Sequence, residues 1–97
     1  MSGYVLTPAA QADVTEIWDY TAERWSREQA TAYIRAIQEA CEGLASGMRI
    51  SRPVDVKPGY LKTSVKSHFI IFRRDGDGLV TVVRILHSRM DVERHLR

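Results

Sequence analysis

Four side chains in the C-terminal half of the chain are of the types that acid–base chemistry on RNA requires. They are two histidines and two fixed cations, namely His68, His87, Arg89 and Lys62. Cleavage of RNA needs a base for the 2′-hydroxyl proton, an acid for the leaving oxygen and cations for the phosphate. The strands predicted around the histidines contain no carboxylate that could serve as a further base. We therefore favour structural roles, with His68 as a sheet residue and His87 as a hydrogen-bonded hinge before the tail.

Other kinds of reactive site have weaker support. His87 and His95 are eight positions apart across a strand end, which is poor geometry for a shared metal ion. The segment Asp75–Gly78 alternates Asp with Gly, but it lacks the later ligands and the closing Glu of a calcium loop, so it predicts a hairpin turn. Cys41 is the single cysteine and is expected in the core. We expect neither a metal nor a cofactor.

A first helix is expected to begin near Pro8. Thr7 is a suitable N-cap, and proline is tolerated at the first helical position because its missing N–H would have no partner there. Apolar and small residues then recur at helical spacing: Ala10, Val14, Ile17, Trp18 and Thr21. On this pattern the acidic residues are expected to face elsewhere: Asp13, Glu16 and Asp19.

A second helix is expected to begin after Ser26. Gln29 follows three residues later, as in a capping box, and Gly47 is a suitable stop. The apolar stripe between them contains Ala30, Tyr33, Ile34, Ile37, Cys41 and Leu44. The short connection between the helices predicts an antiparallel hairpin.

Strands complete the predicted fold. They are expected at Tyr4–Leu6, Gly59–Val65, His68–Arg73 and Val80–His87, with a loop at Met48–Pro58. The order strand, helix, helix, strand, strand, strand predicts an α+β fold, in which an antiparallel two-helix hairpin packs on a small antiparallel sheet. We expect one domain over residues 1–97, with a C-terminal basic tail at residues 88–97.

Both faces of the last two strands are mostly apolar. Pairing Arg74 with Leu79 across the turn would give one face the residues His68, Ile70, Phe72, Val83, Ile85 and His87. The other face would carry Phe69, Ile71, Arg73, Val80, Val82, Arg84 and Leu86. Two helices can cover only one face, so we expect the second to be closed by the tail, by a partner or by both. The tail would dock through Met90, Val92 and Leu96.

Composition and charge narrow the class of protein. A chain of 97 residues that is 44% hydrophobic and 27% charged is typical of one small globular domain. No stretch is long and apolar enough to span a bilayer, no signal peptide is evident, and we expect a cytoplasmic protein. Residues 1–48 carry three basic and seven acidic residues, whereas residues 49–97 carry eleven and five. This uneven charge has two interpretations. Either the basic half binds an acidic partner or nucleic acid, or both halves are simply solvated surface whose opposite charges cancel.

The large aromatic residues of the helical hairpin divide into two groups. Trp18 and Tyr33 are expected to pack in the core. Trp25 lies at the helix junction beside Arg24 and Arg27, where we expect it to be half exposed and available as an anchor for a partner.

Six segments, spread in order over nearly the whole chain, form a recognisable set. They are Leu6-Thr7-Pro8-Ala9-Ala10, Ile17-Trp18-Asp19-Tyr20, Arg24-Trp25, Pro58-Gly59-Tyr60, His68-Phe69-Ile70-Ile71-Phe72-Arg73 and Arg84-Ile85-Leu86-His87-Ser88-Arg89-Met90-Asp91. Together they resemble the ParE toxins of the RelE/ParE superfamily of bacterial toxin–antitoxin systems. Two departures are the Ile71-Phe72 pair, where an aromatic pair ending in Tyr is more usual, and the Met48-Arg49-Ile50 loop, where Gly often precedes the Arg.

The resemblance implies a fold, a function and two partners. The fold would be the small RelE/ParE toxin fold, and the protein would poison DNA gyrase without catalysis of its own. A ParD-like antitoxin would wrap the toxin with its C-terminal segment and bind operator DNA with its N-terminal domain. For the antitoxin contact we expect Trp25, Phe72, Arg73 and Arg84. For the target contact we expect the tail residues Arg89, Met90, Arg94 and His95.

Two alternative functions follow from the same superfamily. RelE-like members are ribosome-dependent mRNA endonucleases that use basic residues near the positions of His68 and Arg89, and some relatives use a His near the position of His87. The chain lacks the fuller Lys, Arg and Tyr set of that branch, so we rank this function second. The third alternative is a non-toxic module that only binds antitoxin or joins a repressor complex.

Overall fold

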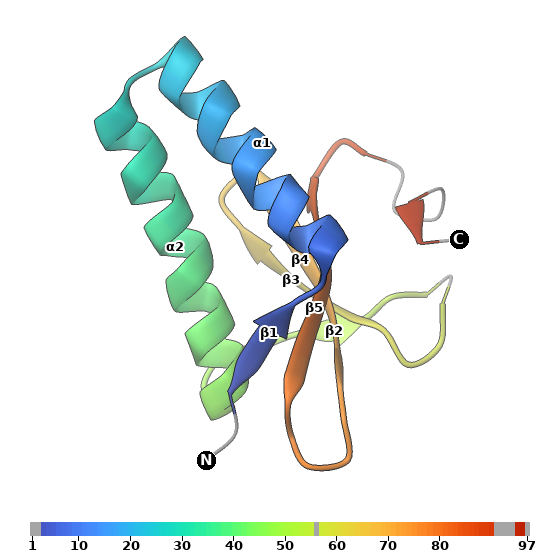
Figure 1. Cartoon of the computed structure of the whole chain (residues 1–97). Coiled ribbons are helices and arrows are strands. Elements are labelled where there is room, and N and C mark those ends of the chain that lie inside the picture. The colour runs from blue at the N-terminus through green and yellow to red at the C-terminus, as the bar shows by residue number, and fades with distance from the viewer. Residues whose placement is uncertain (1–2, 56, 91–94, 97) are drawn as a thin grey trace.

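The computed structural model describes residues 3–55, 57–90, 95 and 96, and it places a helical hairpin on one side of a sheet (Figure 1). In chain order the elements are β1 (Tyr4–Leu6), α1 (Pro8–Arg24), α2 (Arg27–Ser46), β2 (Arg52–Pro53), β3 (Leu61–Val65), β4 (His68–Arg74) and β5 (Val80–His87). The predicted α+β class and element order are confirmed. The additional strand β2 is two residues long and lies within the segment that was predicted to be a loop.

The helix boundaries follow the predicted caps. The Thr7 hydroxyl accepts a hydrogen bond from the Ala10 N–H at 3.2 Å, and the Ser26 hydroxyl accepts one from the Gln29 N–H at 3.0 Å. Gly47 ends α2 in the left-handed region, with φ of 81°. Residues close to each helix end therefore determine where the helix begins or stops, because they bond backbone N–H or C=O groups that have no partner within the helix.

The sheet is mixed, whereas a small antiparallel sheet was predicted. Its five strands have the order β1-β5-β4-β3-β2, and β1 runs parallel to β5 with Tyr4 opposite Val80 and Leu6 opposite Val82. The other neighbours are antiparallel. The direction of β1 depends on how the helical hairpin returns the chain to the sheet, and a three-residue apolar segment carries no signal for that.

A β-bulge in β5 changes the predicted faces. Arg74 pairs with Val80, Phe72 pairs with Val82 and Ile71 pairs with Arg84, so Val83 is an extra residue in β5. As a result Val80 and Val82 join Phe72 in the cluster under the helices, and Val83 packs on the opposite face. The prediction was wrong for these three valines. It was correct for His68, Ile70, Phe72 and Ile85, which share the helix side.

The chain itself covers much of the second face of the sheet. A cluster of Val54, Ile71, Leu86 and Leu96 forms there, with Tyr60, Phe69 and Val83 packed against it. Leu96 is 7% exposed, which confirms that the end of the chain docks on the domain. Met90, by contrast, is 46% exposed, and Val92 lies outside the described residues. The loop before β3 and the chain end therefore provide most of the closure that was expected from the tail or a partner.

Candidate functional site

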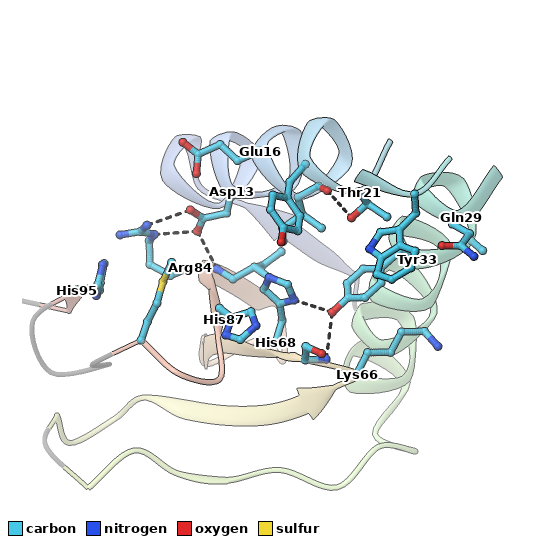
Figure 2. A pocket seen from close by; sticks show the side chains of 17 residues that line it. Asp13, Glu16, Thr21, Gln29, Tyr33, Lys66, His68, Arg84, His87 and His95 are labelled. Atoms are coloured by element: carbon cyan, nitrogen blue, oxygen red, sulfur yellow. Dashed lines mark hydrogen bonds and ion pairs between the residues drawn. The ribbon is translucent and has the colours of Figure 1, made fainter. Parts of the chain in front are cut away.

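A groove of about 920 Å³ lies between the helical hairpin and the ends of β4 and β5, and we call it the main groove (Figure 2). Side chains of α1, α2, the β3–β4 turn, β4, β5 and the C-terminal segment line it. One end is aromatic, the middle contains two histidines, and a bidentate ion pair lies at the other end.

The aromatic end exposes two large rings at the helix junction. Tyr20 is 61% exposed and Trp25 is 66% exposed, and both line the main groove. The Arg24 guanidinium lies 5.9 Å from the centroid of the Tyr20 ring. The predicted exposure of Trp25 is confirmed. Trp18, which was predicted to pack in the core, is only partly buried and belongs to neither core cluster.

Tyr33, Ser67 and His68 form a hydrogen-bonded chain in the middle of the groove. The Ser67 N–H donates to the Tyr33 hydroxyl at 3.0 Å, and that hydroxyl lies 2.6 Å from Nδ1 of His68. The Tyr33 hydroxyl has one proton and two lone pairs, so it can bond Ser67 and His68 at the same time. The same hydroxyl supports the tight turn in which Lys66 has a φ of 51°.

His87 meets His68 at the groove floor. The two rings are 5.2 Å apart between centroids and stand edge to face at 77°. Nδ1 of His87 accepts from the Arg89 N–H at 3.1 Å, and the Ser88 N–H donates to the Ser67 carbonyl at 2.8 Å. His87 is thus a hydrogen-bonded hinge between β5 and the tail, as predicted.

Titration of the buried groups favours neutral forms. Burial, followed by the proximity of His87, lowers the pKa of His68 below 6.5, while Asp13 opposes this shift. Burial also raises the pKa of Cys41 to about 11, and the residue is 1% exposed. A protonated, enclosed thiol is not a nucleophile at neutral pH, which agrees with the predicted core role of Cys41.

Asp13 is buried, although the helical pattern predicted that it faces away from the core. Its carboxylate accepts from Nε and Nη2 of Arg84 at 2.8 and 2.9 Å and from the Ile85 N–H at 2.8 Å. Asp13 is 7% exposed, and the hydrogen bond to its carboxylate raises the pKa of Arg84 above its ordinary value. The interaction ties α1 to β5 at a point past the last residue of β5 that pairs with β1. The Asp13 carboxylate there accepts from the Ile85 N–H in place of a neighbouring strand.

The four residues considered for RNA cleavage are not brought together. His68 and His87 meet, but Lys62 lies over the Phe69 ring at 4.9 Å, on the opposite side of β4 from His68. The Arg89 side chain is exposed, and its backbone N–H bonds His87. Within the part of the chain that the structure describes, no group of three or more His, Cys, Asp or Glu residues could hold a metal ion.

The residues expected to contact partners occupy three different environments. Trp25 and Arg84 line the main groove, as do Met90 and His95 of the tail, whereas Arg73 is exposed near Asp75 with 3.9 Å between charged atoms. Phe72 is fully buried between the sheet and the helices, so its side chain is not available to a partner in this conformation. Arg94 lies outside the described residues.

Sequence reasoning missed two groove residues for which a signal exists. Asp13 is three residues after Ala10 and four before Ile17, so its spacing places it on the buried stripe of α1. Tyr20 is adjacent to the stripe residue Thr21 and close to Trp25 in sequence. An acidic residue at a core position implies a buried cationic partner, although the pattern does not identify Arg84.

A family model described as "ParE toxin of type II toxin-antitoxin system, parDE" matches residues 4–92. The chain belongs to the ParE toxin family. Toxin ParE1 of Mycobacterium tuberculosis is 49% identical to this ParE-family chain over 96 residues, which is 98% of each protein. Toxin ParE1 of Caulobacter vibrioides is 35% identical over 97 residues, which is 99% of each.

A solved structure supports the fold of this ParE-family chain. One chain of a solved structure described as "Chromosomal ParDE TA system from P. aeruginosa" superposes on this protein with a TM-score of 0.76 and 23% sequence identity. The superposition covers 90% of this chain and 96% of that chain. The resemblance stated from the sequence is therefore confirmed. The protein is a ParE-type toxin of a type II toxin–antitoxin system, and its family implies an antitoxin partner.

Proposed function

We propose that this ParE-family toxin inhibits DNA gyrase and is neutralised by a ParD-like antitoxin, a segment of which occupies the main groove. The observation that carries the antitoxin part is the groove itself, with two exposed aromatic rings at one end and polar groups beyond them. Tyr and Trp are frequent anchors of protein interfaces because each offers a large apolar surface with few rotatable bonds.

The shape and chemistry of the groove suit an amphipathic segment. Ile17 and Ile85 are buried on its floor, and Tyr20 and Trp25 form its aromatic end. A helix or strand with an apolar face can cover these residues and place polar side chains toward Lys66 and Glu16. A stable complex of this kind buries on the order of 800 Å² on each partner.

Inhibition by binding fits the local chemistry better than catalysis does. Lys62 lies on the other side of β4 from His68, and Arg89 contacts His87 through its backbone N–H, so neither of these contacts sets a cation beside the two imidazoles. We therefore assign the toxin no active site of its own. Operator DNA would be contacted only through the antitoxin. Gyrase acts in the cytoplasm, so we place the toxin there, and no described helix could cross a membrane.

The antitoxin assignment is tested with a groove variant and a matched surface variant. Trp25→Ala should weaken binding of the purified antitoxin by at least about tenfold, because a buried aromatic anchor contributes about 2 kcal/mol or more. Val5→Ala provides the control, since Val5 is 47% exposed on β1 and does not line the groove. Equal affinity of both variants and the unchanged protein would count against the groove as the antitoxin site.

The gyrase assignment is tested directly on the enzyme. Purified toxin should inhibit DNA supercoiling or trap cleaved DNA, and added antitoxin should restore activity. Toxin that leaves both reactions unchanged, with an active gyrase control, would remove this target.

A second candidate function is the ribosome-dependent mRNA endonuclease. It is favoured by one observation, the contact of the His68 and His87 rings in an open groove. Primer extension on translated message should then reveal codon-linked cuts that disappear in His87→Ala. If strong expression without antitoxin leaves growth unaffected, the non-toxic binding module becomes the better description.

A further inference from the structure

Two apolar side chains far outside the main groove project into solvent from the loop after α2. Met48 is 85% exposed and Ile50 is 89% exposed, the largest values among the large hydrophobic residues that the structure describes. They lie beside a hollow of about 460 Å³ that shares no lining residue with the main groove. Exposed apolar side chains gathered in one place on a small domain are typical of an interaction surface.

Hydrogen bonds hold the backbone of this loop in place. Nε of Arg49 donates to the Thr63 hydroxyl at 3.1 Å, its Nη2 donates to the Ser64 carbonyl, and the Thr63 hydroxyl donates to the Ile50 carbonyl at 3.0 Å. The Met48 and Arg49 N–H groups both donate to the Gly43 carbonyl, at 2.9 and 3.1 Å. A Cβ added at Gly43 would approach the Arg49 Cβ to 3.2 Å, so the loop lies tightly against α2.

This arrangement is preorganised for binding. A loop that is already ordered loses little further conformational entropy when a partner arrives. Arg49 lies between the two apolar residues and anchors the backbone to β3, which leaves both apolar side chains directed away from the domain.

The charge around the hollow selects the kind of partner. Arg49, Arg52 and Lys62 line it, and no acidic residue is among its described lining. Arg52 is exposed. The surface therefore combines two apolar anchors with two cations, Arg52 and Lys62. A protein segment with an apolar side chain flanked by carboxylates complements it.

We propose that Met48, Ile50, Arg52 and Lys62 form a second docking surface, which binds an acidic, apolar segment of the protein that the toxin inhibits. The proposal rests on the proposed function in that it assumes a target protein, whatever its identity. Nucleic acid complements the cations but leaves the two most exposed apolar side chains in water, so a protein is the better occupant. Target and antitoxin then contact different surfaces of the toxin.

The test uses the full chain with Met48→Ser and Ile50→Ser combined, which keeps Arg49 and its contacts. Arg52→Glu tests the charge, with Arg35→Glu on exposed α2 as its matched control, and Val5→Ser is the control for loss of an exposed apolar side chain. Each variant is expressed without antitoxin to measure growth arrest. Each is also measured for affinity to purified gyrase, to purified antitoxin and to a duplex DNA fragment.

We expect the double variant and Arg52→Glu to lose growth arrest and to bind gyrase at least about tenfold more weakly. Their affinity for antitoxin should stay within about twofold of the unchanged toxin, because distant sites behave independently. Their thermal midpoints should also be unchanged, which separates lost docking from lost folding.

Other outcomes overturn the proposal. Unchanged growth arrest in the double variant leaves the surface without this role, and a tenfold loss of antitoxin affinity assigns it to the antitoxin. Lost DNA binding, with gyrase affinity retained, assigns it to nucleic acid. If the unchanged toxin arrests growth but neither binds nor inhibits gyrase, the gyrase assignment fails. The docking surface is then still tested by whether the double variant and Arg52→Glu lose growth arrest. An unchanged toxin that arrests no growth overturns both.

Discussion

Replacing Asp13 by Ala is expected to be one of the most destabilising single changes in α1. The carboxylate accepts three hydrogen bonds, two from Arg84 and one from the Ile85 N–H, and is 7% exposed. Breaking a buried ion pair costs about 3–5 kcal/mol, and an unpaired buried N–H costs about 1–3 kcal/mol. The Arg84 side chain is 27% exposed, so water can solvate the guanidinium in the variant and reduce the first cost.

We therefore expect a loss of about 3 kcal/mol in the free energy of unfolding, which is a large part of the roughly 5–15 kcal/mol of a typical domain. In a domain of this size the melting temperature should fall by roughly 12–24 °C. Chemical and thermal denaturation followed by circular dichroism measure both quantities. Asp19→Ala is the matched control, because Asp19 is an exposed aspartate on the same helix.

A double-mutant cycle with Arg84→Ala separates the two contributions. The coupling energy between positions 13 and 84 reports the ion pair, and the part of the Asp13→Ala loss that persists in the Arg84→Ala background reports the Ile85 hydrogen bond. A loss below about 1 kcal/mol for Asp13→Ala, equal to that of Asp19→Ala, would refute the reasoning, because exposed ion pairs contribute no more than that.

Three further outcomes are expected. Tyr33→Phe removes the hydroxyl that joins Ser67 to His68, and denaturant titration should give a loss of about 1–2 kcal/mol. Burial lowers the pKa of His68 below 6.5, so on acidification the unfolded chain binds a proton before the folded chain does. The free energy of unfolding should therefore fall as the pH drops below 6.5 toward the pKa of the folded state. Urea titrations at a series of pH values should give a smaller dependence on pH for His68→Asn. Leu96→Ala opens the cluster on the second face and should cost about 2 kcal/mol, whereas a cost near zero would mean that the chain end contributes nothing to that core.

Residues with local physical signals were predicted correctly. Thr7, Pro8, Ser26 and Gly47 set the helix ends, because capping depends on atoms within a few residues of the end. Alternation and turn chemistry gave β4 and β5 nearly to the residue. The same local strings carry the ParE resemblance, so the family was also accessible from the sequence.

Features that depend on pairs distant in sequence were not predictable in the same way. The bulge at Val83 is invisible to a pattern of alternating apolar residues because valines occupy positions 80, 82 and 83, and any of them could face the core. The buried partner of Asp13 is 71 residues away, and the partner of His68 is 35 residues away on α2.

The sequence by itself thus determined the element order, the helix ends, the exposure of Trp25 and the family, since these depend on local chemistry and periodicity. Only the tertiary structure decided the parallel pairing of β1, the pairing of Asp13 with Arg84, the burial of Phe72, the contact of His68 with Tyr33 and the separation of Lys62 from the histidines. The physical reason is that a residue's type sets which interactions it can make. Whether the partner is present depends on packing between segments that the chain order leaves far apart.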